Sequence, residues 1–204
     1  MTRVGILGGS FNPPHVGHLI CARLAAEQLD LDEVLLMPLA QPSHRTLESD
    51  PGPAARLELC QLAVQGDPVL VASNVEVERG GVSYMVETLE SLAGVRPEAE
   101  FVLILGADAA TRLEGWREPE RILELSSLAI APRGSQGDAG SAVEKVKEHF
   151  PDARVEPFEM PPIGISSSQL RSRIGAGLSV RDMVPEPVAE RIAAEGWYRG
   201  GAGA

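Results

Sequence analysis

The sequence predicts an α/β fold built on a doubly wound, mostly parallel sheet with helices on both of its faces. Short apolar runs that end in glycine or proline alternate along the chain with segments of helical spacing, as buried strands alternate with helices in such folds. The chain has 204 residues, of which 44% are hydrophobic, enough for one core of ordinary size. We therefore expect one domain over residues 1–204, in which residues 165–198 form a C-terminal helical portion.

The expected strands are short apolar runs. Arg3–Gly8 is followed by a second glycine, Glu33–Met37 is closed by Pro38, and Glu100–Leu105 is the clearest buried strand. Because these runs are apolar along their whole length, we expect both faces of the sheet to be covered. Further extended segments are expected at Val69–Ala72, Val75–Val77, Leu128–Ile130 and, as an edge strand, Ala153–Pro157.

The first expected helix covers Gly17–Leu29, where apolar residues recur at helical spacing. Another covers Tyr84–Leu92, with Ser83 as its cap, and the last is ended by Gly196. The residues of the first helix expected to face inward are Leu19, Ile20, Leu24 and Leu29. Two further helices are expected at Pro53–Val64 and Ala142–His149, with loops at 38–53 and Gly134–Gly140.

Charge and composition exclude some classes of function. The formal net charge of −11 disfavours a non-specific nucleic-acid binder, which needs the opposite sign. No signal peptide or membrane-length apolar run is present, so we expect a cytoplasmic protein with no membrane partner. Cys21 and Cys60 lie in apolar helical runs and are expected to be reduced core thiols. A small anionic substrate remains compatible, because a local cluster of His, Arg and backbone N–H groups can outweigh a distant charge.

The stretch "GILGGSFNPPHVGH" joins the first expected strand to the first helix. Its glycines match neither the G-x-G-x-x-G fingerprint nor a P-loop, since no G-K-[ST] follows. The helix N-terminus near His15–Gly17 offers unpaired N–H groups and a positive dipole, which suit a phosphate. Ligands of parallel sheets bind beyond the carboxyl ends of the strands, where Gly8–His18, Gly106–Asp108 and Pro132–Arg133 are all expected.

His15 and His18 are spaced to share one side of the first helical turn. They could form a core or capping pair, a metal site or a phosphate-binding pair. A metal site needs further ligands, and neither H-E-x-x-H nor C-x-x-C occurs in the chain. The phosphate-binding pair is the interpretation we favour.

A second constellation is "ISSSQLR", residues 165–171. Three serines place hydroxyls and free N–H groups at a helix start, and Arg171 follows one turn later with a guanidinium that can fork onto phosphate oxygens. Taken alone, the pattern favours ordinary serine capping beside a surface arginine. Together with the glycine turn and the two histidines, it suggests one half of a triphosphate clamp.

The two motifs "GGSFNPPHVGH" and "ISSSQLR" resemble those of the nucleotidyltransferase superfamily marked by H-x-G-H and a late I-S-S-[ST]-x-x-R, which has a Rossmann-like fold. Within it, the chain resembles the bacterial nicotinate-nucleotide adenylyltransferases from Val4 to about Tyr198. That family joins ATP to nicotinate mononucleotide and forms deamido-NAD and pyrophosphate in NAD biosynthesis. The stretches that point to it are "PSHR", "SYMVETL", "GADAATRLEGW" and "VPEPVAERIAAEGWY".

The resemblance implies a role for each matching residue. It makes His15, His18 and Arg171 the catalytic residues, whose positive potential, with that of helix N–H groups, neutralises the leaving pyrophosphate. It implies Mg²⁺ bound through the ATP phosphates and no metal site of the protein itself. The ATP-binding residues it implies are Gly8, Gly9, Ser10, Phe11, His15, His18, Gly106, Asp108, Ile165, Ser166, Ser167 and Arg171. Those it implies for the mononucleotide are Ser10, His44, Arg45, Tyr84, Met85, Trp116 and Arg133.

Three departures from the family pattern concern the mononucleotide pocket. Met85 stands where Thr is usual, Leu39-Ala40 where Asn is common, and Pro132–Arg133 where an Arg pair is usual. Two other functions therefore stay open: a sibling adenylyltransferase acting on nicotinamide mononucleotide or phosphopantetheine, and a non-catalytic nucleotide sensor. The resemblance also allows a homo-oligomer.

Overall fold

The computed structural model describes residues 2–43, 46–132 and 139–199. Its centre is a six-stranded sheet in which all neighbouring strands are parallel, in the order β3-β2-β1-β4-β5-β6. The strands are β1 (Thr2–Gly9), β2 (Glu33–Pro38), β3 (Leu70–Ala72), β4 (Ala99–Gly106), β5 (Ser126–Ala131) and β6 (Val155–Pro157). This arrangement confirms the predicted α/β fold, a Rossmann-like doubly wound sheet.

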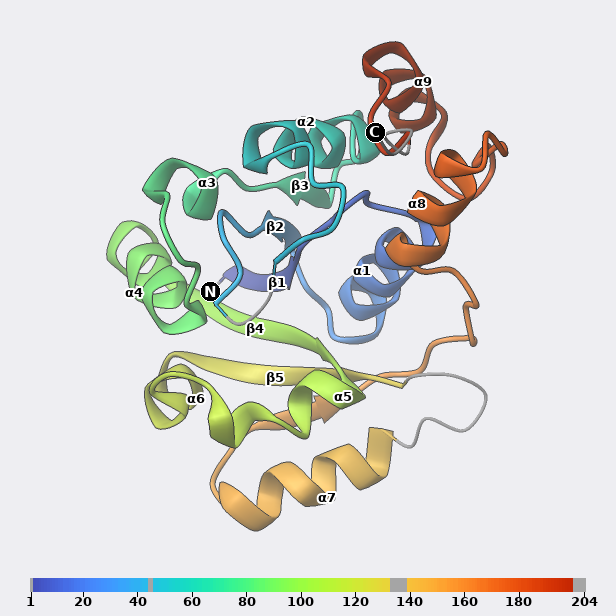
Figure 1. Cartoon of the computed structure of the whole chain (residues 1–204). Coiled ribbons are helices and arrows are strands. Elements are labelled where there is room, and N and C mark those ends of the chain that lie inside the picture. The colour runs from blue at the N-terminus through green and yellow to red at the C-terminus, as the bar shows by residue number, and fades with distance from the viewer. Residues whose placement is uncertain (1, 44–45, 133–138, 200–204) are drawn as a thin grey trace.

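Helices cover both faces of the sheet (Figure 1). Side chains of β1 and β4 alternate between the faces, so that Ile6 and Leu103 enter one core and Leu7 and Val102 the other. The first core is closed by α4 (Met85–Val95), α5 (Ala107–Ala110), α6 (Pro119–Leu125) and α7 (Ala139–His149). The second is closed by α1 (Val16–Gln28) and α2 (Pro53–Ala63). The short 3-10 helix η1 spans Leu113–Gly115.

The C-terminal portion forms a third apolar cluster on α2. Helices α8 (Ser167–Gly175) and α9 (Glu186–Glu195) bury Leu170, Val188 and Ile192 against Leu59 of α2. Gly196 ends α9 with a φ of 68°, as expected for a glycine cap. Figure 1 shows α8 and α9 at one end of the molecule, beside α1 and α2. The C-terminal portion, which is late in the sequence, is thereby brought beside the turn that joins β1 to α1.

One predicted extended segment is wrong, because Val75–Val77 lies in the helix α3 (Val75–Arg79). The β-branched residues favour a strand locally, but β3 pairs with β2 over three residues and the chain then leaves the sheet. In the helix, the carboxylate of Glu76 is buried and accepts a hydrogen bond from the Thr88 hydroxyl, with 2.7 Å between the oxygens. Tertiary packing thus overrides the local preference.

The inward face of α1 also differs from the prediction. Leu29 is buried as expected, but Ile20 is 36% exposed, and Leu19 and Leu24 are half-buried. Small residues face the sheet instead and let the helix backbone approach it closely. They are Gly17, Ala22, Ala25 and Ala26.

Two helix starts differ from their predictions. Tyr84, rather than Ser83, caps α4, and the Ser83 hydroxyl accepts a hydrogen bond from the N–H of Ala40 at 2.9 Å. Helix α7 begins at Ala139, so Gly140 belongs to a helix, while 134–138 of the expected linker lie outside the described residues.

Both cysteines are free, and burial raises the pKa of the Cys21 thiol to about 11. Among the residues described, no helix is long and apolar enough to cross a membrane.

Candidate active site

The candidate site lies where the winding of the sheet reverses. From β1 the chain moves outward to β2 and β3, whereas from β4 it moves outward to β5 and β6 on the other side. The carboxyl ends of β1 and β4 therefore leave a crevice between their diverging loops, the usual position of a ligand in such sheets. Gly8 and Gly9 end β1 here, and Gly106 ends β4. Two cavities open at this edge, one on each side of the turn that follows β1.

The larger cavity has a volume of about 580 Å³ and a mostly apolar lining. An added Cβ on Gly8 would lie 3.1 Å from the Met85 Cε, so a side chain at position 8 would crowd the cavity wall. The Arg117 guanidinium lies 4.7 Å from the centre of the Tyr84 ring, which it covers on one side. Residues that line this cavity include Gly8, Gly9, Leu39, Glu76, Tyr84, Met85, Leu103, Leu105, Trp116 and Arg117.

The smaller cavity has a volume of about 260 Å³ and a mostly polar lining. It lies between the turn after β1, the loop after β2 and the first turns of α8. A cavity of this size with hydroxyl, amide and guanidinium groups suits a small anion better than an apolar ligand. Its lining residues are Ser10, Asn12, Thr46, Leu47, Glu48, Ser168 and Arg171.

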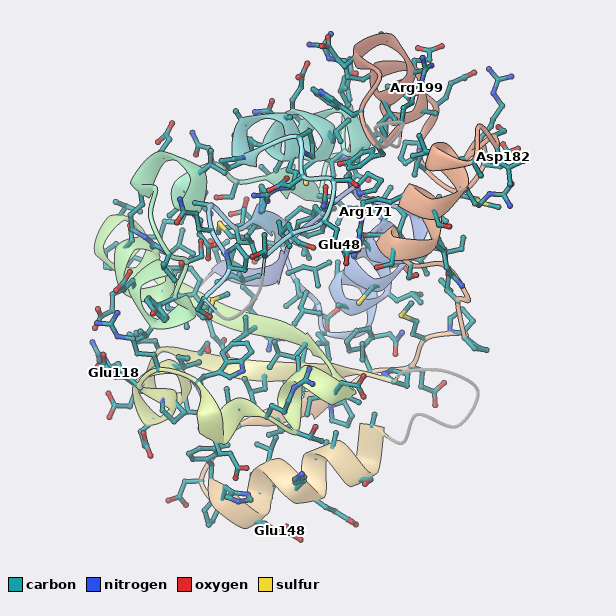
Figure 2. All side chains as sticks on the ribbon, viewed as in Figure 1. Glu48, Glu118, Glu148, Arg171, Asp182 and Arg199 are labelled. Atoms are coloured by element: carbon teal, nitrogen blue, oxygen red, sulfur yellow. The ribbon has the colours of Figure 1, made fainter. Side chains whose placement is uncertain are left out.

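Among the described residues that line the smaller cavity, Arg171 carries the positive charge. Its guanidinium donates one hydrogen bond to the carbonyl oxygen of Asn12 at 2.9 Å and another to the Ser168 hydroxyl at 3.3 Å. The Glu48 carboxylate lies 3.7 Å away, and Figure 2 shows these two side chains facing one another between α2 and α8. The Arg171 side chain is 15% exposed whereas that of Glu48 is 88% exposed. The guanidinium is thus held by neighbouring groups, whereas its acidic neighbour extends into solvent.

The serine cluster holds α8 against the turn after β1. Ser166 is the N-cap of α8 and forms a capping box with Gln169, whose side chain accepts from the Ser166 N–H at 3.0 Å. The Ser167 hydroxyl donates to the carbonyl oxygen of Pro13 at 2.9 Å. Ser166 and Ser167, which were predicted to bind ATP, thus serve the cap and the contact to Pro13, whereas the serine that lines the smaller cavity is Ser168.

The two histidines of the H-x-G-H motif stack on one another at the start of α1. Their ring centres are 3.7 Å apart and the ring planes differ by 26°. The Nδ1 atom of His18 accepts a hydrogen bond from the backbone N–H of His15 at 3.2 Å. An added Cβ on Gly17 would lie 3.0 Å from the Nδ1 atom of His15, so a side chain at position 17 would push against the stacked His15 ring.

Both histidines are neutral in the ligand-free protein at pH 7. Burial lowers the pKa of His15 from 6.5 to about 4. Burial also lowers the pKa of His18 well below 6.5, and the neighbouring His15 adds to that effect. In the free protein, the neutral rings can therefore offer an anion their N–H groups as donors but no net positive charge. With Nδ1 of His18 occupied as an acceptor, the ring proton lies on Nε2, which is a neutral hydrogen-bond donor.

The other predicted residues differ in how close they lie to the two cavities. Phe11 is buried, with a φ of 45°, and its ring meets His18 edge-on at 4.9 Å. Tyr84, Met85 and Trp116 all line the larger cavity, whereas Ser10 lines the smaller one. His44, Arg45 and Arg133 lie outside the described residues. Several described residues that were predicted to bind ATP line neither cavity. They are Phe11, His15, His18, Gly106, Asp108, Ile165, Ser166 and Ser167.

Sequence reasoning missed several residues at this edge of the sheet, among them Arg117 of the larger cavity. Asn12 is buried, and its amide nitrogen donates to the carbonyl oxygen of Glu48 at 3.0 Å, while its amide oxygen has no partner within the described part of the chain. Glu48 and Glu76 each line one cavity. Arg56 is fully buried on α2, and its position beside Leu59 and Cys60 on the apolar stripe of that helix was a signal in the sequence.

No cluster of three or more His, Cys, Asp or Glu side chains that could hold a metal ion occurs in residues 2–43, 46–132 and 139–199. The polar cavity offers the exposed Glu48 carboxylate, a hard donor suited to a divalent cation, whereas the amide oxygen of Asn12 is buried. Nucleotidyltransferases generally use a divalent metal ion together with ATP. The Glu48 carboxylate fits an ion that arrives already bound to phosphate oxygens.

A doubly wound sheet with an H-x-G-H turn and a serine-capped helix at its switch point defines a nucleotidyltransferase. The family model described as cytidylyltransferase-like matches residues 6–173, and the chain belongs to that family. Within it, the chain is one of the nicotinate-nucleotide adenylyltransferases, as comparison with individual proteins shows.

Two curated relatives are both named "probable nicotinate-nucleotide adenylyltransferase". That of Albidiferax ferrireducens is 39% identical over 98% of this chain and 99% of its own length. That of Rhodopirellula baltica is 41% identical over 96% of this chain and 93% of its own length. The structure of Plasmodium falciparum nicotinic acid mononucleotide adenylyltransferase complexed with NaAD superposes with a TM-score of 0.77 over 97% of this chain and 98% of that one. At 16% identity, this likeness supports the fold.

Proposed function

We propose that this enzyme transfers the adenylyl group of ATP to nicotinate mononucleotide, forming deamido-NAD and pyrophosphate. The observation that carries the proposal is the pair of cavities on the two sides of one glycine turn. The polar cavity suits the triphosphate of ATP, and the apolar cavity suits a pyridine ring stacked on Trp116. The names of the curated relatives agree with this assignment.

The proposed site joins the two ends of the chain into one catalytic unit. Hydrogen bonds from Ser167 and Arg171 to the carbonyls of Pro13 and Asn12 hold α8 on the turn after β1. A triphosphate in the polar cavity would meet the Arg171 guanidinium and the Ser168 hydroxyl together. Residues 165–198 are therefore assigned to the same domain as the rest of residues 1–204.

The reaction needs no protein base. A phosphate oxygen of the mononucleotide, already anionic at pH 7, forms a bond to the α-phosphorus of ATP. The bond from that phosphorus to the bridging oxygen breaks, and the electron pair leaves with pyrophosphate. Catalysis then consists of holding two anions in line and stabilising the charge on the leaving group. In this proposal Arg171 supplies a positive charge and His18 supplies a neutral Nε2–H donor.

Magnesium enters the proposed reaction as part of the Mg²⁺–ATP substrate. Its preferred ligands are oxygens, mostly those of phosphates and water. The Glu48 carboxylate, which lines the polar cavity, would contact the hydrated ion. Glu48 would turn from Arg171 to the ion as the triphosphate takes its place.

The start of α4 favours a nicotinate over a nicotinamide acceptor. Met85 is the first residue of α4, where backbone N–H groups lack acceptors within the helix and the dipole is positive. A donor from the backbone does not depend on the side chain, so Met85 can serve as well as the usual Thr. Arg117 adds a positive charge to the same cavity, although Glu87 already accepts from it at 2.7 Å.

Pyrophosphate release tests the proposal directly. The purified protein is assayed with Mg²⁺–ATP and, in turn, nicotinate mononucleotide, nicotinamide mononucleotide and phosphopantetheine. We expect the highest kcat/KM with nicotinate mononucleotide. A higher value with either other acceptor would make the chain a sibling adenylyltransferase, and binding of nucleotides without turnover would make it a sensor.

A further inference from the structure

We propose that Arg56 is a positioning residue, whose buried guanidinium fixes the loops after β1 and β2 relative to one another and so aligns the two proposed substrates. Arg56 lies on α2 with a fully buried side chain. The inference rests on the proposed adenylyl transfer for its kinetic consequence, but its structural consequence is independent of that function.

The guanidinium of Arg56 makes four hydrogen bonds to groups from different parts of the site. One nitrogen, Nη1, donates to the carbonyl oxygens of both Ser10 at 3.0 Å and Leu39 at 2.7 Å. The second, Nη2, donates to the carbonyl oxygen of Ala40 at 3.1 Å. Its Nε donates to the carboxylate of Asp50 at 2.9 Å, which balances the buried charge.

These contacts join the walls of both cavities. Ser10 lines the polar cavity and Leu39 lines the apolar one, and a single nitrogen of Arg56 bridges their carbonyl oxygens. Ala40 extends the connection, because its carbonyl accepts from Arg56 while its N–H donates to the Ser83 hydroxyl at 2.9 Å. Ser83 immediately precedes Tyr84 and Met85 at the start of α4. Arg56 is thereby connected to the walls that would hold each substrate.

A stability role alone would not need this geometry. An arginine that merely fills the core needs a carboxylate and a few acceptors, all of which could belong to one loop. Here the planar Arg56 guanidinium donates to carbonyl oxygens in two loops, those after β1 and β2, which lie on the two sides of the proposed reaction centre. Since in-line transfer is sensitive to displacements of about 1 Å, loosening the bridge should lower turnover more than binding.

The test compares Arg56→Lys with a matched control, Arg3→Lys. Arg3 also combines a carboxylate and a backbone carbonyl, since it donates to Glu156 at 2.9 Å and to the carbonyl oxygen of Leu29, but it lies on β1 at the opposite end of the sheet. A lysine at position 56 keeps the charge beside Asp50 and loses the planar fork. We expect kcat of Arg56→Lys to fall roughly tenfold to hundredfold, with KM values changed less than about threefold. Arg3→Lys should keep kcat within about twofold.

Amide hydrogen exchange tests the same bridge without any substrate. The N–H of Leu39 donates to the carbonyl oxygen of Gly9 at 3.0 Å, across the two loops that Arg56 joins. We expect this amide to exchange about tenfold faster in Arg56→Lys and at the wild-type rate in Arg3→Lys. If the wild-type protein releases no pyrophosphate with any acceptor, the proposed function fails, and this measurement alone decides the role of Arg56.

A second variant covers the case in which Arg56→Lys does not fold. The double variant Arg56→Met with Asp50→Asn removes both charges, so that no unpaired charge is left buried. It should fold, with the same loss of kcat and the same faster exchange. Wild-type kcat and exchange in either folded variant would overturn the proposal. Failure of both to fold would overturn it too, because Arg56 would then be a purely structural residue.

Discussion

The Nδ1 atom of His18 accepts a hydrogen bond from the backbone N–H of His15, with 3.2 Å between the two nitrogens. An atom that accepts cannot also carry the ring proton, so this contact assigns the proton to Nε2. The imidazole therefore offers a neutral donor whose direction is set by the stack on His15. Such a group needs no reorganisation when charge develops on a leaving phosphate.

Replacing His18 by alanine removes this donor. We expect kcat for pyrophosphate release to fall by roughly 10²–10³, the usual cost of losing one preorganised donor to a developing anion. His18→Asn, whose amide nitrogen can donate, should retain more activity. The check is steady-state turnover at a temperature where circular dichroism shows all three proteins folded, and normal turnover in the alanine variant would contradict the role of His18.

The buried histidines should make stability depend on pH. His15 has a pKa of about 4 in the folded protein and about 6.5 when exposed, so between these values the unfolded chain binds a proton that the folded protein does not. Stability should therefore be full above pH 6.5 and fall as the pH drops towards 4, by roughly 3 kcal/mol for this group. Urea unfolding at pH 7, 5.5 and 4.5 measures the slope of the free energy of unfolding against pH. His15→Gln should flatten it, and an unchanged slope would show that His15 is not buried as a neutral ring.

Replacing Arg171 by lysine keeps the charge but loses the fork that now joins the Asn12 carbonyl and the Ser168 hydroxyl. We expect KM for ATP to rise about fivefold to tenfold and kcat to fall, with KM for the mononucleotide almost unchanged. Initial rates over a grid of both substrates separate these effects. A change confined to the mononucleotide would place Arg171 on the wrong side of the site.

Glu48 competes with a polyphosphate for Arg171 in the free protein, at a separation of 3.7 Å. Because the Glu48 side chain is 88% exposed, the pair is weak, and Glu48→Gln should change the apparent ATP affinity about twofold to threefold. We expect Glu48→Gln to bind ATP more tightly than the wild type in the absence of Mg²⁺, because a competing anion is removed. Titration calorimetry measures this affinity. Glu148→Gln, on α7 and far from Arg171 in Figure 2, is the control and should leave this affinity unchanged. Weaker binding in Glu48→Gln would contradict the competition.

Acceptor choice should be decided at the start of α4 rather than by Trp116. An indole ring stacks on either pyridine form, so Trp116→Ala should lower kcat/KM for nicotinate and nicotinamide mononucleotides by the same factor. The ratio between the two acceptors should stay as in the wild type, in favour of the acid. Measuring both values under identical Mg²⁺–ATP tests this. A ratio near one in the wild type would remove the nicotinate assignment and leave adenylyl transfer standing.

The chain by itself determined the class of fold and the two motifs of the site. Uniformly apolar runs ending in Gly9, Pro38 and Gly106 predicted buried parallel strands, because a strand covered on both faces leaves little room for polar residues. Local spacing likewise predicted a helix start near His15–Gly17 and another at the serine cluster 166–168, since caps depend on a few neighbouring residues.

Only the tertiary structure decided the charge of the histidines and the residues that surround them. A pKa depends on burial, and no spacing in the sequence shows that His15 and His18 stack in a buried pocket. Helix α3 formed where β-branched residues favoured a strand, because Glu76 packs against Thr88 from another helix. The bridge made by Arg56 joins residues up to 46 positions apart, and such contacts are decided by how the loops meet after folding.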